Sequence, residues 1–371
     1  MKRPLRILHT ESSMNLGGQE LRILLEMERM EPLGCESWLA ARHDSAILAE
    51  AQRRGLRAFS LPLHNRFDPV SMAILWRFMQ RERIDVVNAH GSRDAWNAFL
   101  VARCLGIATL RSRHVANPIR RHRIGQLVYG ALCDMIVTTS ESIRAGLIEA
   151  GIDAAKIVSV PTGIDVTEFS SAKRTGMVRR ELGIPENVPL IGMISILRGD
   201  KGPDTFLDAC ERLLSQRADV WCVLAGDGPL RPRLEAQHAM LSHRDRIVFA
   251  GFRRDIPQLL AELDALVLAS KSSEGVPQVI LQAHAARVPV VATRVGGISE
   301  VAQEGVTAFM AQPNDPNSLC HAMHGALKDA SLASAQIARG YALVSQSYSL
   351  EVMLRRMADI YGGLANGKIS S

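Results

Sequence analysis

The chain has 371 residues, a net charge of +6, 47% hydrophobic residues and 22% charged residues. At about 150 residues per domain this length predicts two domains, and the composition is that of a globular protein in water. A basic balance favours anionic ligands such as phosphates, nucleotides or anionic lipid head groups. Aromatic residues are only 5% of the chain, which argues against a platform for single-stranded nucleic acid.

The cysteines and the apolar runs indicate in which cellular compartment the protein is expected. The six cysteines are scattered and form no CxxC pair, so we expect buried thiols in a reducing compartment. No apolar run approaches the roughly 18 residues of a membrane span, and the start, MKRPLRILHT, lacks the pattern of a signal peptide. We therefore expect a cytoplasmic protein.

Short apolar runs alternate with amphipathic segments along the whole chain. In the first half the pattern predicts helices that include 19–30 and 71–82, and strands at 6–10, 36–41, 57–63, 85–90, 108–114, 135–140 and 157–163. In the second half it predicts strands at 189–197, 220–228, 246–252, 265–270, 288–294 and 307–312. Such alternation is typical of parallel sheets with helices on both faces. Two series in tandem predict an α/β fold with two doubly wound, Rossmann-like domains that face each other across a cleft.

The polar, aperiodic stretch GIDVTEFSSAKRTGM at about 163–177 is the expected border between the domains. We assign residues 1–168 to an N-terminal domain and 177–345 to a C-terminal domain. The tail is expected to be helical with a break near SQSYSL, and residues 346–371 are expected to pack back toward the N-terminal domain.

Ligands of open α/β sheets bind at the carboxyl ends of the strands, so the loops there hold the candidate sites. The first strand leads into TESSMNLGGQE, where Gly17 and Gly18 let a ligand approach the backbone at a helix start. A plain tight turn is the alternative. A dinucleotide-binding oxidoreductase needs GxGxxG, and only GG is present here.

In the second half, Arg198 and Lys201 lie in the loop RGDKGP, before a helix that Pro203 opens. Two cations beside free backbone N–H groups suit a diphosphate, and a solvated surface pair is the alternative. The loop GxxxxGK[ST] is absent, which excludes a Walker-type ATPase. Asp227 in LAGDGPL is interpreted as a turn residue. Gly251 in GFRRDIPQLL exposes its backbone, which either contacts the edge of a nucleotide base or has no ligand contact.

The stretch SSEGVPQVILQ places the carboxylate of Glu274 before a helix that Pro277 opens. The helix N-terminus favours an anion, and Gln278 and Gln282, four residues apart, share one face. Alternatively, Glu274 only complements the helix end and Gln282 is a solvated surface side chain. The glycine pair 296–297 in a later loop permits a tight turn, or it serves close packing.

Together these loops resemble family 4 of the retaining glycosyltransferases, which have the GT-B fold and transfer a sugar from a nucleotide donor. The resemblance rests on GGQE, CDMIVTTSESIRAGLIEAGI, VPTGIDVTEF, LRGDKG, LAGDGPL, GFRRDIPQLL, SSEGVPQVILQA and PVVATRVGGISEV, in the family's order and spacing. It implies a metal-independent enzyme with a nucleotide diphosphate sugar as co-substrate and no other cofactor. It also implies a hydroxyl acceptor, on a saccharide or a lipid-linked carrier, in the synthesis of cell-envelope polysaccharide, lipopolysaccharide or glycolipid.

The resemblance also implies roles for the matching positions. Lys201 would hold the donor diphosphate, Glu274 would bind the donor sugar and His114 would lie over that sugar, so these three are the catalytic candidates. The donor-binding candidates are Arg198, Lys201, Gly251, Arg253, Glu274, Gly275, Val276, Pro277, Gln278 and Gln282. The acceptor-side candidates are Gly17, Gly18, His90, Arg93 and Arg113. His90 and Arg93, in NAHGSRDAW, are included because they follow a predicted strand, and a plain strand-end residue is the alternative for His90.

Two positions depart from the family pattern. The family usually has a second glutamate eight residues after the first, where this chain has Gln282, and a neutral amide would weaken a ribose contact by about 1 kcal/mol. The family's arginine five residues before the lysine is Ile196 here, and we expect Arg198 to replace it. The family suggests a front-face attack in which the leaving phosphate helps to deprotonate the acceptor.

The first domain carries a basic run, RSRHVANPIRRHR, at 111–123. Its later arginines lie where a helix is expected to begin, which is unfavourable for cations, so we expect an anionic partner. That partner is a phosphorylated acceptor or an anionic membrane surface contacted by Arg111, Arg120, Arg121 and Arg123. A solvated loop is the alternative.

Two other functions stay open at this point. One is a sugar-nucleotide epimerase of related fold, which would need acid and base residues at the second carbon of the sugar. The other is a nucleotide-sugar-binding scaffold without activity. A nucleic-acid-binding role fits least, because no such module is recognised.

Overall fold

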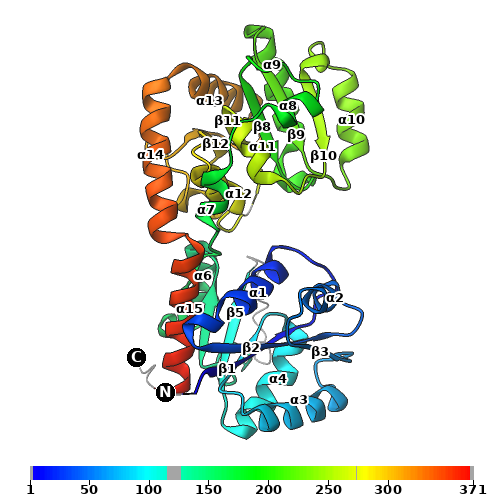
Figure 1. Ribbon diagram of the computed structural model, residues 1–371, viewed down its shortest axis with the longest axis vertical. Coiled ribbons are helices and arrows are strands. Elements are labelled where there is room, and N and C mark those ends of the chain that lie inside the picture. The colour runs from blue at the N-terminus through cyan, green and yellow to red at the C-terminus, as the bar shows by residue number, and fades with distance from the viewer. Residues whose placement is uncertain (1–2, 115–126, 273, 368–371) are drawn as a thin grey trace. The chain divides into compact units, whose positions relative to one another are not determined.

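The computed structural model describes residues 3–114, 127–272 and 274–367. The chain divides into two compact units: unit 1 is Met1–Thr162 with Glu351–Ser371, and unit 2 is Gly163–Leu350. Each unit contains one parallel sheet with helices packed on it (Figure 1). The prediction of two parallel-sheet α/β domains is therefore confirmed.

Unit 1 has, over its described residues, seven strands in the order β3-β2-β1-β4-β5-β6-β7. They are β1 (Leu5–Glu11), β2 (Cys35–Arg42), β3 (Ala58–Leu61), β4 (Val86–Ala89), β5 (Ala108–Arg113), β6 (Met135–Thr138) and β7 (Ile157–Ser159). The helices are α1 (Gly18–Arg29), α2 (Ala46–Arg53), α3 (Pro69–Glu82), α4 (Ser92–Leu105), α6 (Glu141–Glu149) and α15 (Leu350–Ala365). The strand order reverses beside β1, because β2 and β4 flank it.

Alternate residues of the strands explain why helices cover both faces of this sheet. On β2, Trp38 and Ala40 pack into the core formed with α3 and α4. Leu39 and Ala41 point the other way and pack with α1 and α2. Since both faces are buried, the middle of most strands is mostly apolar and lacks the alternating polar pattern of a half-exposed sheet, whereas polar residues such as Glu11 and Arg42 gather at the carboxyl ends.

Unit 2 has, over its described residues, six strands in the order β10-β9-β8-β11-β12-β13. They are β8 (Leu190–Ile194), β9 (Trp221–Ala225), β10 (Ile247–Gly251), β11 (Ala265–Leu268), β12 (Val290–Thr293) and β13 (Phe309–Ala311). The helices are α7 (Val166–Ser171), α8 (Met177–Glu181), α9 (Pro203–Gln216), α10 (Arg231–Ala239), α11 (Ile256–Glu262), α12 (Gln278–Ala285), α13 (Pro316–Lys328) and α14 (Ala330–Ser347). The reversal of strand order lies between β8 and β11.

The segment expected to be a border, 163–177, contains helix α7 and belongs to unit 2. Asp165 caps α7 by accepting hydrogen bonds from the next backbone N–H groups. Ile164 and Phe169 are buried in the core of unit 2. The segment 163–177 looks like a linker because its composition is polar. The buried side chains of Ile164 and Phe169 and the N-cap Asp165 nevertheless give it a defined structure.

The last helix, α15, is part of unit 1. The Tyr361 hydroxyl accepts a hydrogen bond from Asn88 Nδ2 at 2.8 Å and donates one to Glu26 Oε2 at 3.3 Å. Arg22 pairs with Glu26 at 2.9 Å and donates to the Val160 carbonyl at 2.8 Å. This buried network joins α15 to β4 and α1, and both of those elements lead into the loops of the unit 1 site.

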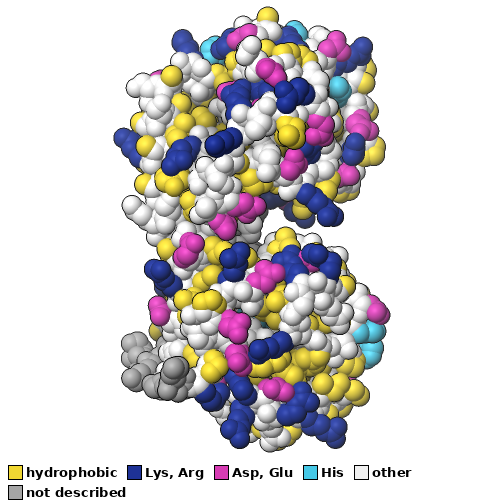
Figure 2. Space-filling view, in the orientation of Figure 1, with side chains coloured by type: hydrophobic (Ala, Val, Ile, Leu, Met, Phe, Trp, Pro, Cys, Tyr) yellow, Lys and Arg dark blue, Asp and Glu magenta, His cyan; other side chains and the backbone are white. Residues whose placement is uncertain are grey.

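All six cysteines lie in the described part of the chain and are free thiols. The prediction that they are buried is wrong for Cys104, which is exposed on the outer face of α4. None of the helices in the described ranges is both long and apolar enough to cross a lipid bilayer. On the face shown in Figure 2, Lys and Arg side chains are interspersed with Asp and Glu.

Replacing Tyr361 by Phe should lower the free energy of unfolding of unit 1 by about 1–2 kcal/mol, because Asn88 and Glu26 would stay buried with one partner fewer. Three of the four tryptophans lie in unit 1, so urea unfolding followed by tryptophan fluorescence reports mainly on that unit. Tyr341→Phe, in α14 of unit 2, is the matched control. Identical unfolding midpoints for Tyr361→Phe and the wild type would contradict the role of the network.

Candidate functional site

In unit 2, two of the catalytic candidates meet at the carboxyl ends of the neighbouring strands β8 and β11, where the strand order reverses. Lys201 lies in the short helical turn after β8, and Glu274 lies between β11 and α12. The Lys201 ammonium contacts Glu274 Oε1, and the Ser270 hydroxyl donates to the same oxygen at 2.6 Å. The side chains of Lys201 and Glu274 are 20% and 11% exposed, so a ligand can reach this ion pair.

Close backbone contacts hold these loops in place. Gly202 has a φ of +67°, and a Cβ atom there would lie 2.1 Å from the Ala269 carbonyl oxygen. Gly296 has a φ of +50°, and a Cβ atom there would lie 2.6 Å from the Glu274 carbonyl oxygen. Gly297 N–H donates to that same oxygen at 2.9 Å. The glycine pair 296–297 therefore packs against the Glu274 loop and supports it, which is the packing role considered from the sequence.

Five of the remaining donor-side candidates follow Glu274 directly, in the loop before α12 or in that helix. Helix α12 begins at Gln278, with Pro277 as its N-cap residue. Gln282 lies one turn further along α12 and is half-buried. Gly275 and Val276 connect Glu274 to this helix end, and Gly251 ends β10.

The two donor-side arginines are each paired with carboxylates. Arg198 is half-exposed and donates to Asp200 Oδ2 at 3.1 Å. Arg253 donates to Asp255 Oδ1 at 2.8 Å and to Glu181 Oε2 at 3.0 Å, and these hydrogen bonds raise its pKa. The structure thus brings Lys201 and Glu274 together, whereas the Arg253 guanidinium is held at the start of α11 by two other acids.

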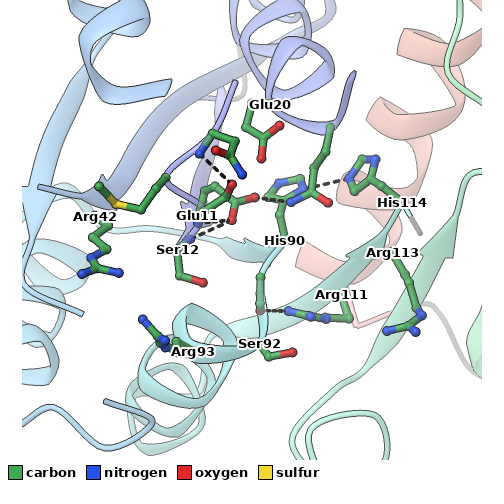
Figure 3. Close-up of a pocket in the computed structure, with 15 residues that line it drawn as sticks. Glu11, Ser12, Glu20, Arg42, His90, Ser92, Arg93, Arg111, Arg113 and His114 are labelled. Carbon is green, nitrogen blue, oxygen red and sulfur yellow. Dashed lines mark hydrogen bonds between the residues drawn. The ribbon is translucent and has the colours of Figure 1, made fainter. Parts of the chain in front are cut away.

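Unit 1 contains a pocket of about 740 Å³ at the carboxyl ends of β2, β1, β4 and β5, which are neighbours in the sheet (Figure 3). His90, Arg93, Arg113 and His114, all named from the sequence, line it. Gly17 is the N-cap residue of α1 and Gly18 its first residue, directly before the lining residues Gln19 and Glu20.

Three histidine rings form a hydrogen-bonded chain that ends in the pocket. His9 Nδ1 lies 3.1 Å from His90 Nε2, and His90 Nδ1 lies 3.1 Å from His114 Nε2. Burial lowers the pKa of all three rings, so each is neutral near pH 7 and has one donor nitrogen. His9 Nε2 is buried without a partner among the described residues, and an unpaired N–H there would cost more than an unpaired lone pair. The protons are therefore assigned to the three Nδ1 atoms, which leaves His114 Nδ1–H as a donor for a ligand.

Glu11, the last residue of β1, also lines the pocket and is almost fully buried. Its Oε1 accepts the backbone N–H groups of Ser12 and Ser13 at 2.7 and 2.8 Å, and Gln19 Nε2 donates to its Oε2. Burial, and then the nearby Asp94 carboxylate, raise the pKa of Glu11 to about 8. The Glu11 carboxyl is therefore mostly protonated at neutral pH.

Asp94, in the first turn of α4, ties together the loops after β1 and β4. Its carboxylate accepts the hydroxyls of Thr10 and Ser12 at 3.0 and 2.8 Å. It also accepts the backbone N–H groups of His90 and Gly91 at 3.1 and 3.0 Å. Four donors around one buried carboxylate hold His90, and through it His114, in place.

Two family models match this chain. The model described as Glycosyltransferase Family 4 matches residues 16–168, and the model described as Glycosyl transferases group 1 matches residues 188–329. The chain belongs to glycosyltransferase family 4. The enzyme carries its first match on the unit with the histidine chain and its second on the unit with the Lys201–Glu274 pair.

Curated relatives of this glycosyltransferase agree with that assignment. It is 25% identical over 338 residues to the UDP-Gal:alpha-D-GlcNAc-diphosphoundecaprenol alpha-1,3-galactosyltransferase of Escherichia coli, with 86% of this chain and 87% of the relative covered. It is 30% identical over 238 residues to the lipopolysaccharide core biosynthesis mannosyltransferase LpsB of Rhizobium meliloti, with 62% and 66% covered.

Solved structures show that the enzyme has the GT-B fold, as predicted. A glycosyltransferase from Rickettsia africae superposes with a TM-score of 0.87 at 20% identity, over 98% of this chain and 99% of that one. Anabaena Alr3699/HepE superposes with a TM-score of 0.85 at 20% identity, over 97% and 100%.

Sequence reasoning missed several residues of the unit 1 site. Glu11 and Arg42 are the last residues of β1 and β2, and the convergence of parallel strand ends is a signal that points to both. Asp94 has no such signal, because an acidic residue in the first turn of a helix is common. His9 lies inside β1, where its sequence position suggests only a core residue. Its role follows from the structure, which places its ring beside that of His90.

The predicted membrane contact of Arg111 is wrong. Its side chain is 3% exposed, it lies within β5 and it donates to the Gly91 carbonyl, so it belongs to the pocket and not to the surface. Three further residues of that prediction lie outside the described residues: Arg120, Arg121 and Arg123.

Replacing Glu11 by Gln should flatten the dependence of stability on pH. The pKa of Glu11 is about 8 in the folded protein against an ordinary 4.5, so between these values the folded state binds a proton that the unfolded chain has released. The free energy of unfolding should therefore fall as pH rises from about 5 to about 8. In Glu11→Gln the accompanying decrease in Tm should be smaller than in the wild type by several degrees. Thermal unfolding across this range measures it, with exposed Glu31→Gln as the control. Equal pH slopes for Glu11→Gln and the wild type would rule out the raised pKa.

Proposed function

We propose that this enzyme is a retaining transferase that moves a sugar from a nucleotide diphosphate sugar, with UDP as the nucleotide, to a hydroxyl acceptor. The observation that carries the proposal is the reachable Lys201–Glu274 pair at the strand reversal of unit 2, beside the N-terminus of α12. The choice of UDP is supported by the Escherichia coli relative, whose name specifies UDP-Gal as its donor.

The charges at this site suit the departure of a diphosphate. Breaking the bond between sugar and phosphate develops positive charge on the sugar and negative charge on the diphosphate. The Lys201 ammonium and the N–H groups at the start of α12 stabilise the negative charge. Glu274, oriented by Ser270, accepts hydroxyl groups of the sugar. In unit 1, His114 Nδ1–H donates to a bound hydroxyl.

We further propose that the reaction uses no metal ion and no cofactor beyond the nucleotide sugar. Lys201 supplies a fixed positive charge for the diphosphate, and the α12 N-terminus adds a second favourable interaction. Transfer in the presence of excess EDTA tests this proposal, and a loss of rate that Mg²⁺ or Mn²⁺ restores would contradict it.

The proposed acceptor belongs to cell-envelope polysaccharide or lipopolysaccharide synthesis at the inner face of the cytoplasmic membrane. The Escherichia coli relative is named for a diphosphoundecaprenol-linked acceptor and the Rhizobium relative for the lipopolysaccharide core. Free thiols at all six cysteines, which lie in the described ranges, suit a reducing compartment.

Replacing Lys201 or Glu274 by Ala should each lower the transfer rate by about 10²–10³-fold, because each removes a group that stabilises the charges formed in the transition state. The donor for the assay is the nucleotide sugar that most raises Tm in a screen, and the rate is the acceptor-dependent release of nucleotide diphosphate. Lys271→Ala is the control, since Lys271 pairs with Asp204. Full turnover in both variants would place the active centre elsewhere.

Replacing Gln282 by Glu should tighten donor binding by up to about tenfold, because a charged acceptor strengthens a hydrogen bond to a ribose hydroxyl. Calorimetric titration with UDP measures the change, and the exposed Gln303→Glu variant is the control. Unchanged affinity of Gln282→Glu for UDP would show that this side chain does not contact the nucleotide.

A further inference from the structure

The pocket of unit 1 has a strong excess of positive charge. Among the described residues, its lining includes four arginines, at the end of β2, in the first turn of α4 and in β5, against two glutamates: Arg42, Arg93, Arg111, Arg113, Glu11 and Glu20. Such a lining is unusual for a site that binds a neutral sugar. Each sugar hydroxyl both donates and accepts hydrogen bonds, so the protein needs acceptors as well as donors.

The two glutamates do not neutralise the arginines. Glu11 is 1% exposed, and burial together with the nearby Asp94 carboxylate raises its pKa to about 8, so it is mostly protonated at neutral pH. Glu20 is 5% exposed, and its Oε2 accepts the Gly17 N–H at 2.8 Å, so its carboxylate complements the start of α1. Asp94, which does not line the pocket, already accepts four hydrogen bonds from its surroundings.

Two of the arginines have donor groups left unused. Arg111 is 3% exposed and donates to Gly91, and its Nε has no partner among the described residues. The Nε of Arg42 is likewise buried and without a partner in the described ranges. Arg93 is exposed and lines the pocket together with Ser12, and both are labelled in Figure 3. A buried guanidinium with an incomplete set of acceptors is costly, and an anionic ligand in the pocket would supply a counter-charge to it.

We propose that this pocket binds an anionic group of the acceptor, a phosphate or a carboxylate, and so selects acceptors that carry one. The proposal rests on the proposed function, which assigns sugar transfer to this enzyme. Arginine pairs with the planar edge of a carboxylate or with two phosphate oxygens through parallel hydrogen bonds. A volume of about 740 Å³ leaves room for a sugar or polyol ring beside the anionic group.

The test is calorimetric titration of the full chain with four ligands: inorganic phosphate, glucose 6-phosphate, glucuronate and glucose. Saturable binding of at least one anion and no detectable binding of glucose is the expected result, and the stronger of the phosphorylated and carboxylated sugars identifies the group. Arg42→Gln and Arg93→Gln should each weaken anion binding about tenfold. Arg77→Gln, an exposed arginine on α3 outside the pocket, should bind like the wild type.

A parallel titration with UDP separates the acceptor from the donor. UDP affinity should be unchanged by Arg42→Gln and Arg93→Gln. An equal loss of UDP and anion affinity in these variants would assign the pocket to the donor diphosphate and overturn the proposal. So would wild-type anion binding in both variants, glucose binding as tightly as the anions, or no saturable binding of any anion. None of these measurements requires turnover, so they stand apart from the rate assay of the Lys201 and Glu274 variants.

Discussion

All strands of a parallel sheet end at the same edge, and both halves of this enzyme depend on that constraint. Where the strand order reverses, consecutive loops leave the sheet in opposite directions and open a space between them. Unit 1 places Glu11 and His90 at its reversal, after β1 and β4, and unit 2 places Lys201 and Glu274 at its own, after β8 and β11. Residues more than seventy positions apart in the chain thus lie at the same edge of one sheet.

The two sites hold their charged groups in different ways. In unit 2 a cation and an anion are paired with each other, and the hydroxyl of Ser270 donates to the carboxylate and orients it. In unit 1 low-dielectric surroundings keep three imidazoles and one carboxyl in their neutral forms. The unit 2 pair is held by opposite charges, whereas the three imidazoles of unit 1 are held by hydrogen bonds between neutral groups.

The architecture could be read from the sequence because each element leaves a local signal. Alternating apolar runs mark the strands, and glycines mark the turns after them. The resemblance named Lys201, Glu274 and His114, and the structure brings the first two together. What the sequence could not show depends on distant partners: Arg253 meets Glu181, 72 positions earlier. The protonation of Glu11 likewise depends on burial that no local pattern records. Arg111 looked like part of a basic surface run and is instead an interior strand residue.

Because α15 belongs to unit 1, the two units are completed in a particular order during synthesis. In the order of synthesis, the strands of unit 1 precede the whole of unit 2, and Tyr361 follows unit 2. Unit 1 is consequently completed only after unit 2 has been synthesised, and Asn88 and Glu26 lack their partner until then. Chaperones that shield nascent chains would act mainly on unit 1 during that interval, and a chain truncated before Tyr361 would leave the core of unit 1 open.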